Sequence, residues 1–195
     1  MDLYASRMDF FNVYAQGFAR VAAATLPVAD FDPAANAERT LQVVREAHER
    51  GVAVVAFPEL GISGYAIDDL LLTDSLLDAV LDAVVQLCRG TADYRPLIAV
   101  GAPVALGNRL YNCAVVIQHG RVLGIVPKSY LPNYREFYEK RHFAAGMNDL
   151  PLTVGIPGWG ELIPVGNDLI FTATDVPGLK VHAEVCEDMW VPVPP

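Results

Sequence analysis

The chain has 195 residues, which is enough for one domain or for a large part of one. Apolar residues make up 53% and charged residues 19%, so the chain can form a hydrophobic core, and its composition is neither disordered nor collagen-like. The net charge is −9 and lysine and arginine form no run, which argues against a nucleic-acid partner bound through its phosphates.

The first part of the chain predicts a strand, a helix and a second strand. Residues 17–26 are apolar and are expected to form a buried strand. A helix is expected to begin at Pro33, after the capping residue Asp32, and to end at Gly51. Residues 52–57 (VAVVAF) are short and continuously apolar, which is typical of a strand covered on both faces. This order is typical of an α/β protein.

A second amphipathic helix is predicted over residues 76–88, where apolar residues recur on one stripe. Ser75 is a candidate cap at its start, and Gly90 is expected to terminate it. Residues 97–101 follow as a short buried strand. The alternation of strands and helices therefore continues to this point.

The second half of the chain predicts further strands. Residues 112–118 and 122–126 flank His119-Gly120 and are expected to form a hairpin, so the sheet should mix parallel and antiparallel neighbours. Residues 169–171 and 179–185 also favour strands, separated by a turn. No internal repeat or interdomain linker is evident in the sequence.

Cysteine usage and the N-terminal residues favour a cytoplasmic protein without metal. The three cysteines, Cys88, Cys113 and Cys186, are too few for a disulfide framework and lack zinc-type spacing. Residues 1–7 carry early charges and lack the apolar block of a signal peptide, and either Met1 or Met8 can be the true start. No uncharged stretch approaches the ~20 residues that cross a bilayer.

Three polar side chains directly follow predicted strands, where loops converge to build sites. They are Glu59, Lys128 and Cys186. A thiol needs a base to become a good nucleophile, and a tetrahedral intermediate needs a stabilised oxyanion. Glu59 can act as the base and Lys128 as the oxyanion partner, so the trio is sufficient for acyl transfer. Taken singly, each residue also has a structural interpretation, as a surface glutamate, a solvated lysine and a buried thiol.

The segments around these residues resemble the nitrilase, or carbon–nitrogen hydrolase, superfamily in order and spacing. They are residues 57–65 (FPELGISGY), 128–134 (KSYLPNY) and 186–188 (CED). More narrowly, residues 69–72, 110–120, 132–141 and 186–190 resemble the glutamine-dependent NAD⁺ synthetase family. The resemblance covers nearly the whole chain from about Met8 onward.

The resemblance implies a fold and a set of roles. The fold would be an α/β, nitrilase-type αββα sandwich with mixed sheets, and residues 1–195 would be the N-terminal portion of the glutaminase domain. Cys186 would be the nucleophile, Glu59 the general base and Lys128 the oxyanion stabiliser. Tyr134, Glu187 and Trp190 would shape the glutamine pocket; packing around the strand end is the alternative for Glu187 and Trp190. A second glutamate would support the lysine, either Glu136 or Glu139.

The implied function is hydrolysis of the side-chain amide of L-glutamine, which supplies ammonia for the conversion of deamido-NAD⁺ to NAD⁺. ATP, Mg²⁺ and deamido-NAD⁺ would bind a synthetase domain whose SGGxDS loop does not occur in these 195 residues, so the chain is expected to be truncated. The glutaminase domain implies no metal or other cofactor, no membrane partner and a homo-oligomer. The alternatives are a stand-alone nitrilase-family amidase and a non-catalytic fragment that serves assembly.

Overall fold

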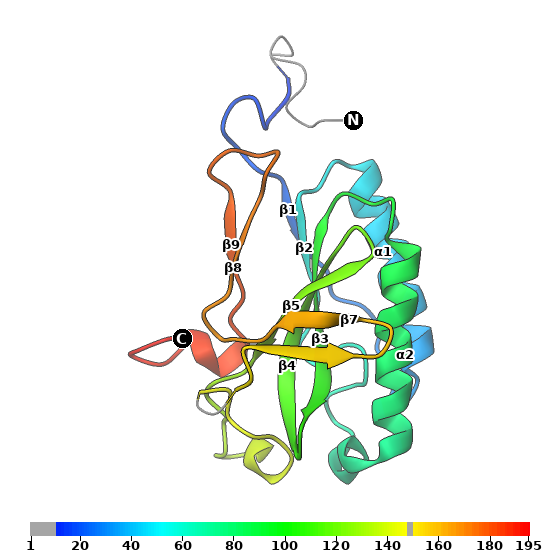
Figure 1. The fold of residues 1–195 in the computed structure, drawn as a ribbon, viewed down its shortest axis with the longest axis vertical. Helices are drawn as coiled ribbons and strands as arrows, with labels where there is room; N and C mark the ends of the chain where they lie inside the picture. The colour runs from blue at the N-terminus through cyan, green and yellow to red at the C-terminus, as the bar shows by residue number, and fades with distance from the viewer. Residues whose placement is uncertain (1–10, 148–149) are drawn as a thin grey trace.

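A five-stranded mixed sheet forms the centre of the molecule in the computed structural model, which describes residues 11–147 and 150–195 (Figure 1). Its strands lie in chain order and are β1 (Val21–Ala23), β2 (Val54–Ala56), β3 (Leu97–Leu106), β4 (Arg109–Gln118) and β5 (Arg121–Pro127). The first three strands pair in parallel, and β3, β4 and β5 pair antiparallel. The predicted mixture of parallel and antiparallel neighbours is therefore confirmed.

Two helices, α1 (Pro33–Glu49) and α2 (Asp74–Gly90), cover one face of this sheet (Figure 1). Asp32 caps α1 as predicted, because its side chain accepts a hydrogen bond of 2.9 Å from the backbone N–H of Ala35. The stripe of α2 buries Val84 and Leu87 completely, and these side chains join one hydrophobic cluster with Val55 of β2. Burial of this apolar stripe positions α2 on the sheet.

Several predicted boundaries differ from the structure. Thr73, rather than Ser75, is the N-cap of α2, and Gly90 is its last helical residue. The strand predicted over 17–26 is only three residues long, because β1 is an edge strand that pairs with the three residues of β2. The strand predicted over 97–101 extends to Leu106, since β4 pairs with it along its whole length.

Two short hairpins complete the architecture. The hairpin of β6 (Thr153–Ile156) and β7 (Gly160–Pro164) was not predicted from the sequence, and the indole N–H of Trp159 anchors it to the Leu81 carbonyl of α2 at 3.0 Å. The other hairpin, β8 (Ile170–Thr172) and β9 (Lys180–His182), confirms the late strands in shorter form. It lies on the side of the main sheet opposite the helices (Figure 1).

In the described residues, no helix combines the length and the apolar character that crossing a bilayer requires. The main sheet lies between a helical layer on one face and the small β8–β9 sheet on the other, and this arrangement places the ends of β2, β5 and β9 near one another (Figure 1).

Candidate active site

The three predicted site residues lie on loops that leave three different strands. Glu59 follows β2, Lys128 follows β5 directly, and Cys186 begins the short 3₁₀ helix η3 (Cys186–Met189) after β9. Glu59 and Cys186 both line a cavity of about 460 Å³ between the main sheet and the segment that leads from β9. The structure thus brings together, at one sheet end, residues that are 127 positions apart in the chain (186 − 59).

A glycine in β3 lets the Glu59 loop lie against the sheet. A Cβ atom at Gly101 would be 2.3 Å from the backbone nitrogen of Leu60 and 2.5 Å from the carbonyl oxygen of Pro58. The loop is held there by a 3.1 Å hydrogen bond from the Ile62 N–H to the Gly101 carbonyl. Only a residue without a side chain permits this approach, so Gly101 helps to fix where Glu59 points.

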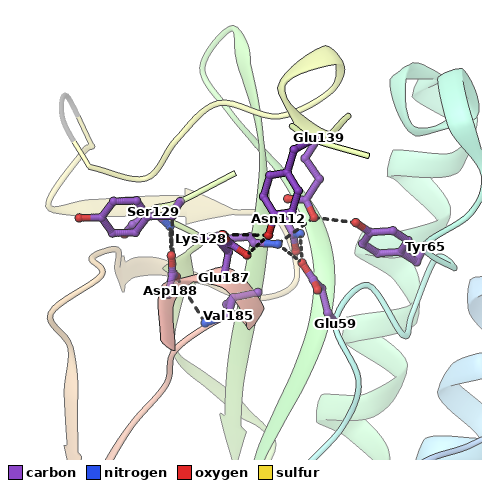
Figure 2. Close-up of polar contacts among 11 residues, drawn as sticks. Glu59, Tyr65, Asn112, Lys128, Ser129, Glu139, Val185, Glu187 and Asp188 are labelled. Atoms are coloured by element: carbon purple, nitrogen blue, oxygen red, sulfur yellow. Dashed lines mark hydrogen bonds and ion pairs between the residues drawn. The ribbon is translucent and has the colours of Figure 1, made fainter. Parts of the chain in front are cut away.

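Lys128 is fully buried between two carboxylates (Figure 2). Its Nζ donates to Glu59 Oε1 at 2.6 Å and to Glu139 Oε1 at 2.8 Å. Burial by itself lowers the pKa of the Lys128 ammonium, but the hydrogen bonds and charges of Glu139 and Glu59 outweigh it and raise the pKa above its ordinary value. Lys128 is therefore a fixed positive charge beside Glu59.

Glu139, and not Glu136, contacts the lysine. Glu139 opens the 3₁₀ helix η2 (Glu139–Arg141) and is 5% exposed, whereas Glu136 lies exposed on the preceding loop. The alternative that the sequence left open is resolved by this geometry.

Sequence reasoning missed two further residues of this network. The Tyr65 hydroxyl donates to Glu139 Oε1 at 2.7 Å, and the side-chain amide of Asn112 donates to Glu59 Oε1 at 2.5 Å (Figure 2). Asn112 is completely buried in the middle of the sheet, where an amide needs a polar partner. A polar residue inside the predicted apolar strand 112–118 was the signal that could have identified it.

Cys186 has a strained backbone and a thiol that faces Glu59. Its φ angle is +51°, in the left-handed region that non-glycine residues seldom adopt, and such conformations often occur at functional sites. Burial raises the pKa of the Cys186 thiol, and the charge and hydrogen bond of Glu59 raise it further, while the charge of Lys128 lowers it. The resting site therefore holds a thiol next to an acceptor for its proton.

The three residues predicted to shape a substrate pocket do not line the cavity of about 460 Å³; Glu187 follows Cys186 in η3, and Tyr134 contacts Glu187 from another loop. The Tyr134 hydroxyl donates to the Glu187 carboxylate, with distances of 3.0 and 3.2 Å to its two oxygens. This hydrogen bond raises the pKa of Tyr134. The Trp190 side chain is 71% exposed and follows η3. The structure therefore joins Tyr134 to Glu187, and the role of Trp190 stays a prediction.

The described residues contain no cluster of three or more histidine, cysteine, aspartate or glutamate side chains that could hold a metal ion. All three cysteines, which lie in this described part, are free thiols, and Cys88 and Cys113 are buried. Burial raises the pKa of Cys88 to about 11 and also raises that of Cys113. Cys186 is consequently the thiol that both reaches solvent and has a carboxylate partner.

Comparison with known proteins gives the family of the chain. A glutamine-dependent NAD⁺ synthetase of Mycobacterium leprae is 52% identical over 189 residues, which are 96% of this chain and 27% of that protein. The crystal structure of a glutamine-dependent NAD⁺ synthetase from Cytophaga hutchinsonii superposes with a TM-score of 0.72 at 25% identity, over 80% of this chain and 26% of that one.

An amidase from Nesterenkonia sp. shares the fold, with a TM-score of 0.66 at 21% identity over 89% of this chain and 57% of the amidase. The chain spans about a quarter of the length of the curated synthetases that it matches (27%). The carbon-nitrogen hydrolase family model matches residues 20–194, nearly all of the described chain. The chain belongs to the carbon-nitrogen hydrolase family.

Proposed function

We propose that this chain is the glutamine-hydrolysing part of a glutamine-dependent NAD⁺ synthetase. The observation that carries the proposal is the fully buried Lys128, held by Glu59 and Glu139 beside the Cys186 thiol. The identity of 52% to a glutamine-dependent NAD⁺ synthetase supports glutamine as the substrate. The cytoplasmic location and the homo-oligomer expected from the sequence are part of the same proposal.

The reaction begins with the transfer of the Cys186 proton to Glu59. The sulfur then attacks the side-chain amide carbon of glutamine, and the carbonyl oxygen becomes an oxyanion. The Lys128 ammonium stabilises this oxyanion, an effect that is typically worth a few kcal/mol in a preorganised site. Glu59 returns its proton to the amide nitrogen, so the C–N bond breaks and ammonia leaves a thioester on Cys186.

Hydrolysis of the thioester uses the same groups again. Glu59 takes a proton from water, the hydroxide attacks the thioester carbon, and Lys128 stabilises the second oxyanion. The C–S bond then breaks, glutamate leaves, and the proton on Glu59 returns to the sulfur. The cycle ends with the thiol and the carboxylate in their starting forms.

Glu139 is suited to keep Lys128 charged during this cycle. When Glu59 is protonated it no longer offers a negative charge to the ammonium, but Glu139 still does at 2.8 Å. The Tyr65 hydroxyl holds Glu139 Oε1 in this position. Two carboxylates with one lysine therefore allow one of them to carry a proton without discharging the lysine.

Glutamine recognition is proposed for Tyr134, Glu187 and Trp190. The Glu187 carboxylate offers a negative charge for the α-ammonium group of an amino acid, and the Tyr134 hydroxyl fixes its orientation. Trp190, which is 71% exposed, can cover a bound substrate. ATP, Mg²⁺ and deamido-NAD⁺ are proposed for the synthetase activity of the longer relatives, and the steps at Cys186 do not use them.

The stand-alone amidase remains a second candidate because the fold of this chain also matches the Nesterenkonia amidase. The substrate distinguishes the two. A glutaminase releases ammonia from L-glutamine and discriminates against amides without an α-ammonium group, such as acetamide, whereas a general amidase accepts them. A non-catalytic assembly fragment releases ammonia from neither.

A chimera tests the proposal in a full-length setting. The chain replaces the matching 189-residue segment of the Mycobacterium leprae synthetase, and NAD⁺ formation is measured with glutamine and with ammonium salt as nitrogen source. We expect activity with both sources, and Cys186→Ala should abolish only the glutamine-dependent activity. Cys88→Ala is the matched control that should retain both. Equal loss with both nitrogen sources in Cys186→Ala would overturn the proposed role of this thiol.

A further inference from the structure

Asp188 is a buried carboxylate whose hydrogen bonds join two distant segments. It lies in η3 and is 1% exposed. The N–H groups of Ser129 and Tyr130 donate to its Oδ1 at 3.0 and 2.8 Å, and Ser129 also lies 3.2 Å from Oδ2. The N–H of Val185 donates to Oδ2 at 3.3 Å (Figure 2). Within the described chain, the hydrogen bonds of this carboxylate all come from backbone N–H groups.

The two segments that Asp188 joins carry the reactive groups of the proposed site. Ser129 and Tyr130 directly follow Lys128, and Val185 directly precedes Cys186. The Lys128 backbone is also held on its other side, because its N–H donates to the Asn112 carbonyl and its carbonyl accepts from the Gly146 N–H, each at 2.8 Å. Lys128 is thereby attached to the main sheet.

Cys186 has a weaker attachment of its own. It follows the three-residue strand β9, which pairs with the equally short β8 in a separate two-stranded sheet. The left-handed backbone at Cys186 must be held by its surroundings. Asp188 closes a tight turn around this residue, since its carboxylate accepts from the Val185 N–H and its own N–H donates to the Val185 carbonyl at 3.2 Å. A second contact between the segments is the 2.8 Å hydrogen bond from the Tyr130 hydroxyl to the Val193 carbonyl.

We infer that Asp188 is a positioning residue that sets the place of the Cys186 sulfur relative to Lys128 and Glu59. This inference rests on the proposed function of these three residues. An ionised carboxylate accepts strong hydrogen bonds from backbone N–H groups, and several donors on one carboxylate fix both segments that carry them. Displacing a nucleophile by about 1 Å can cost about 10²-fold in rate, so a tie of this kind matters to the chemistry.

The test compares Asp188→Asn and Asp188→Ala in the full chain. The amide oxygen of Asn can still accept from Ser129 and Tyr130. Its NH₂ group faces the Val185 N–H, and because both groups are donors they form no hydrogen bond, so only the attachment near Cys186 is lost. Ala loses both attachments. Asp82→Asn removes the same charge from the exposed surface of α2 and is the matched control.

Two rates are measured on folded protein, with the melting temperature recorded for each variant. The first is alkylation by iodoacetamide as a function of pH, followed by mass spectrometry of the Cys186 peptide. The second is labelling by 6-diazo-5-oxo-norleucine, an electrophilic glutamine analogue. The pKa of Cys186 is raised in the wild type by burial and by Glu59, so a displaced thiol should titrate closer to the ordinary value of about 8.5.

We expect the alkylation midpoint to fall in both Asp188 variants, and the labelling rate with the glutamine analogue to fall about tenfold in Asp188→Asn and about 10²-fold in Asp188→Ala. Asp82→Asn should match the wild type in both measurements. A folded Asp188→Asn with a wild-type midpoint and labelling rate overturns the inference. Loss of folding in both variants also overturns it, because Asp188 then only supports the fold.

The alkylation profile separates this inference from the proposed function. If the wild type reacts with iodoacetamide but not with the glutamine analogue, glutamine recognition is wrong. The midpoint of the Asp188 variants still decides whether Asp188 positions the thiol. If the analogue labels the wild type and the midpoint does not move in the variants, the proposed function stands and the positioning role is wrong.

Discussion

The two faces of the main sheet differ sharply although the same strands build both. On the face toward the helices, Val55, Val100 and Val115 are at most 1% exposed and belong to the hydrophobic cluster. On the opposite face, Ala56 is exposed and Ala99 is half-buried, and a cavity of about 460 Å³ separates the strands from the β9 segment. The small side chains of Ala56 and Ala99 leave room for the cavity, and the buried valines of the helical face supply stability.

Burial therefore has different energetic consequences at the two faces. Burial on the helical face is apolar and stabilises the fold through the hydrophobic effect. Burial at the end of the other face includes an ammonium and two carboxylates, which is costly unless every charge is paired. The site residues are therefore expected to respond to substitution differently from residues of the helical face.

The largest effect is expected for Lys128→Ala. Removing the lysine leaves Glu59 and Glu139 without their shared cation, and breaking a buried ion pair from one side typically costs about 3–5 kcal/mol of unfolding free energy. Urea unfolding measures this loss. The triple variant Glu59→Gln, Lys128→Met, Glu139→Gln should recover much of the stability and remain unreactive toward the glutamine analogue. A stability loss below about 1 kcal/mol in Lys128→Ala would contradict the buried network.

Leu87→Ala on the helical face is expected to cause a comparable loss of stability without changing the reactivity of Cys186. Leu87 is completely buried, and truncation of such a side chain costs about 2–5 kcal/mol. The iodoacetamide profile of Cys186 in the folded variant should stay as in the wild type. Leu162→Ala is the control, since Leu162 is 78% exposed and its truncation should change stability by about 0.5 kcal/mol or less.

Gly101→Ala should lower both the stability of the protein and the labelling rate of Cys186. The added Cβ would be 2.3 Å from the Leu60 nitrogen, so the loop that carries Glu59 must move, at a cost of about 1–3 kcal/mol. Slower labelling of Cys186 should accompany the loss of stability. Ala105→Val lies in the same strand and on the same face but is exposed and outside the cavity, and it should change stability by about 0.5 kcal/mol or less. Equal effects of the two variants would show that the close approach at Gly101 is unimportant.

The smallest effect on stability, and the clearest on the reactivity of Cys186, is expected for Glu59→Gln, because Lys128 keeps Glu139 as its partner and Glu59 is partly exposed. The negative charge of Glu59 raises the pKa of Cys186, so its removal should lower the midpoint of alkylation. The thiolate is then present at lower pH, yet turnover of glutamine should stop because the base is gone. Glu161→Gln changes an exposed residue of β7 and should leave the midpoint in place. An upward shift in Glu59→Gln would contradict the assigned contact.

The sequence allowed the positions of Glu59, Lys128 and Cys186 to be predicted because each follows a strand. It also indicated the mixed sheet and α1, whose cap Asp32 was recognised. The choice between Glu136 and Glu139 depended on how residues 132–141 turn at η2, which periodicity does not reveal. The structure places Glu139 against the lysine.

Other parts of the site and the fold could not be predicted from sequence patterns, for physical reasons that the structure makes clear. Asn112 lies in β4, and one polar residue in a mostly apolar strand does not by itself predict a buried hydrogen bond to a distant carboxylate. Asp188 accepts from the backbone N–H groups of Ser129 and Tyr130, which are 59 and 58 residues away, and no side-chain pattern encodes such partners. The β6–β7 hairpin is mostly exposed and interrupted by glycine and proline, so it lacks the alternation that predicts a strand.

The central claim is that Cys186 is a thiol nucleophile in a site that recognises glutamine. Intact-mass spectrometry after incubation with 6-diazo-5-oxo-norleucine tests it most directly, in the wild type, Cys186→Ala and the control Cys88→Ala. The account predicts one adduct per chain in the wild type and the control, none in Cys186→Ala, and protection by L-glutamine. Absence of an adduct in the folded wild type, or an adduct that persists in Cys186→Ala, would contradict the claim.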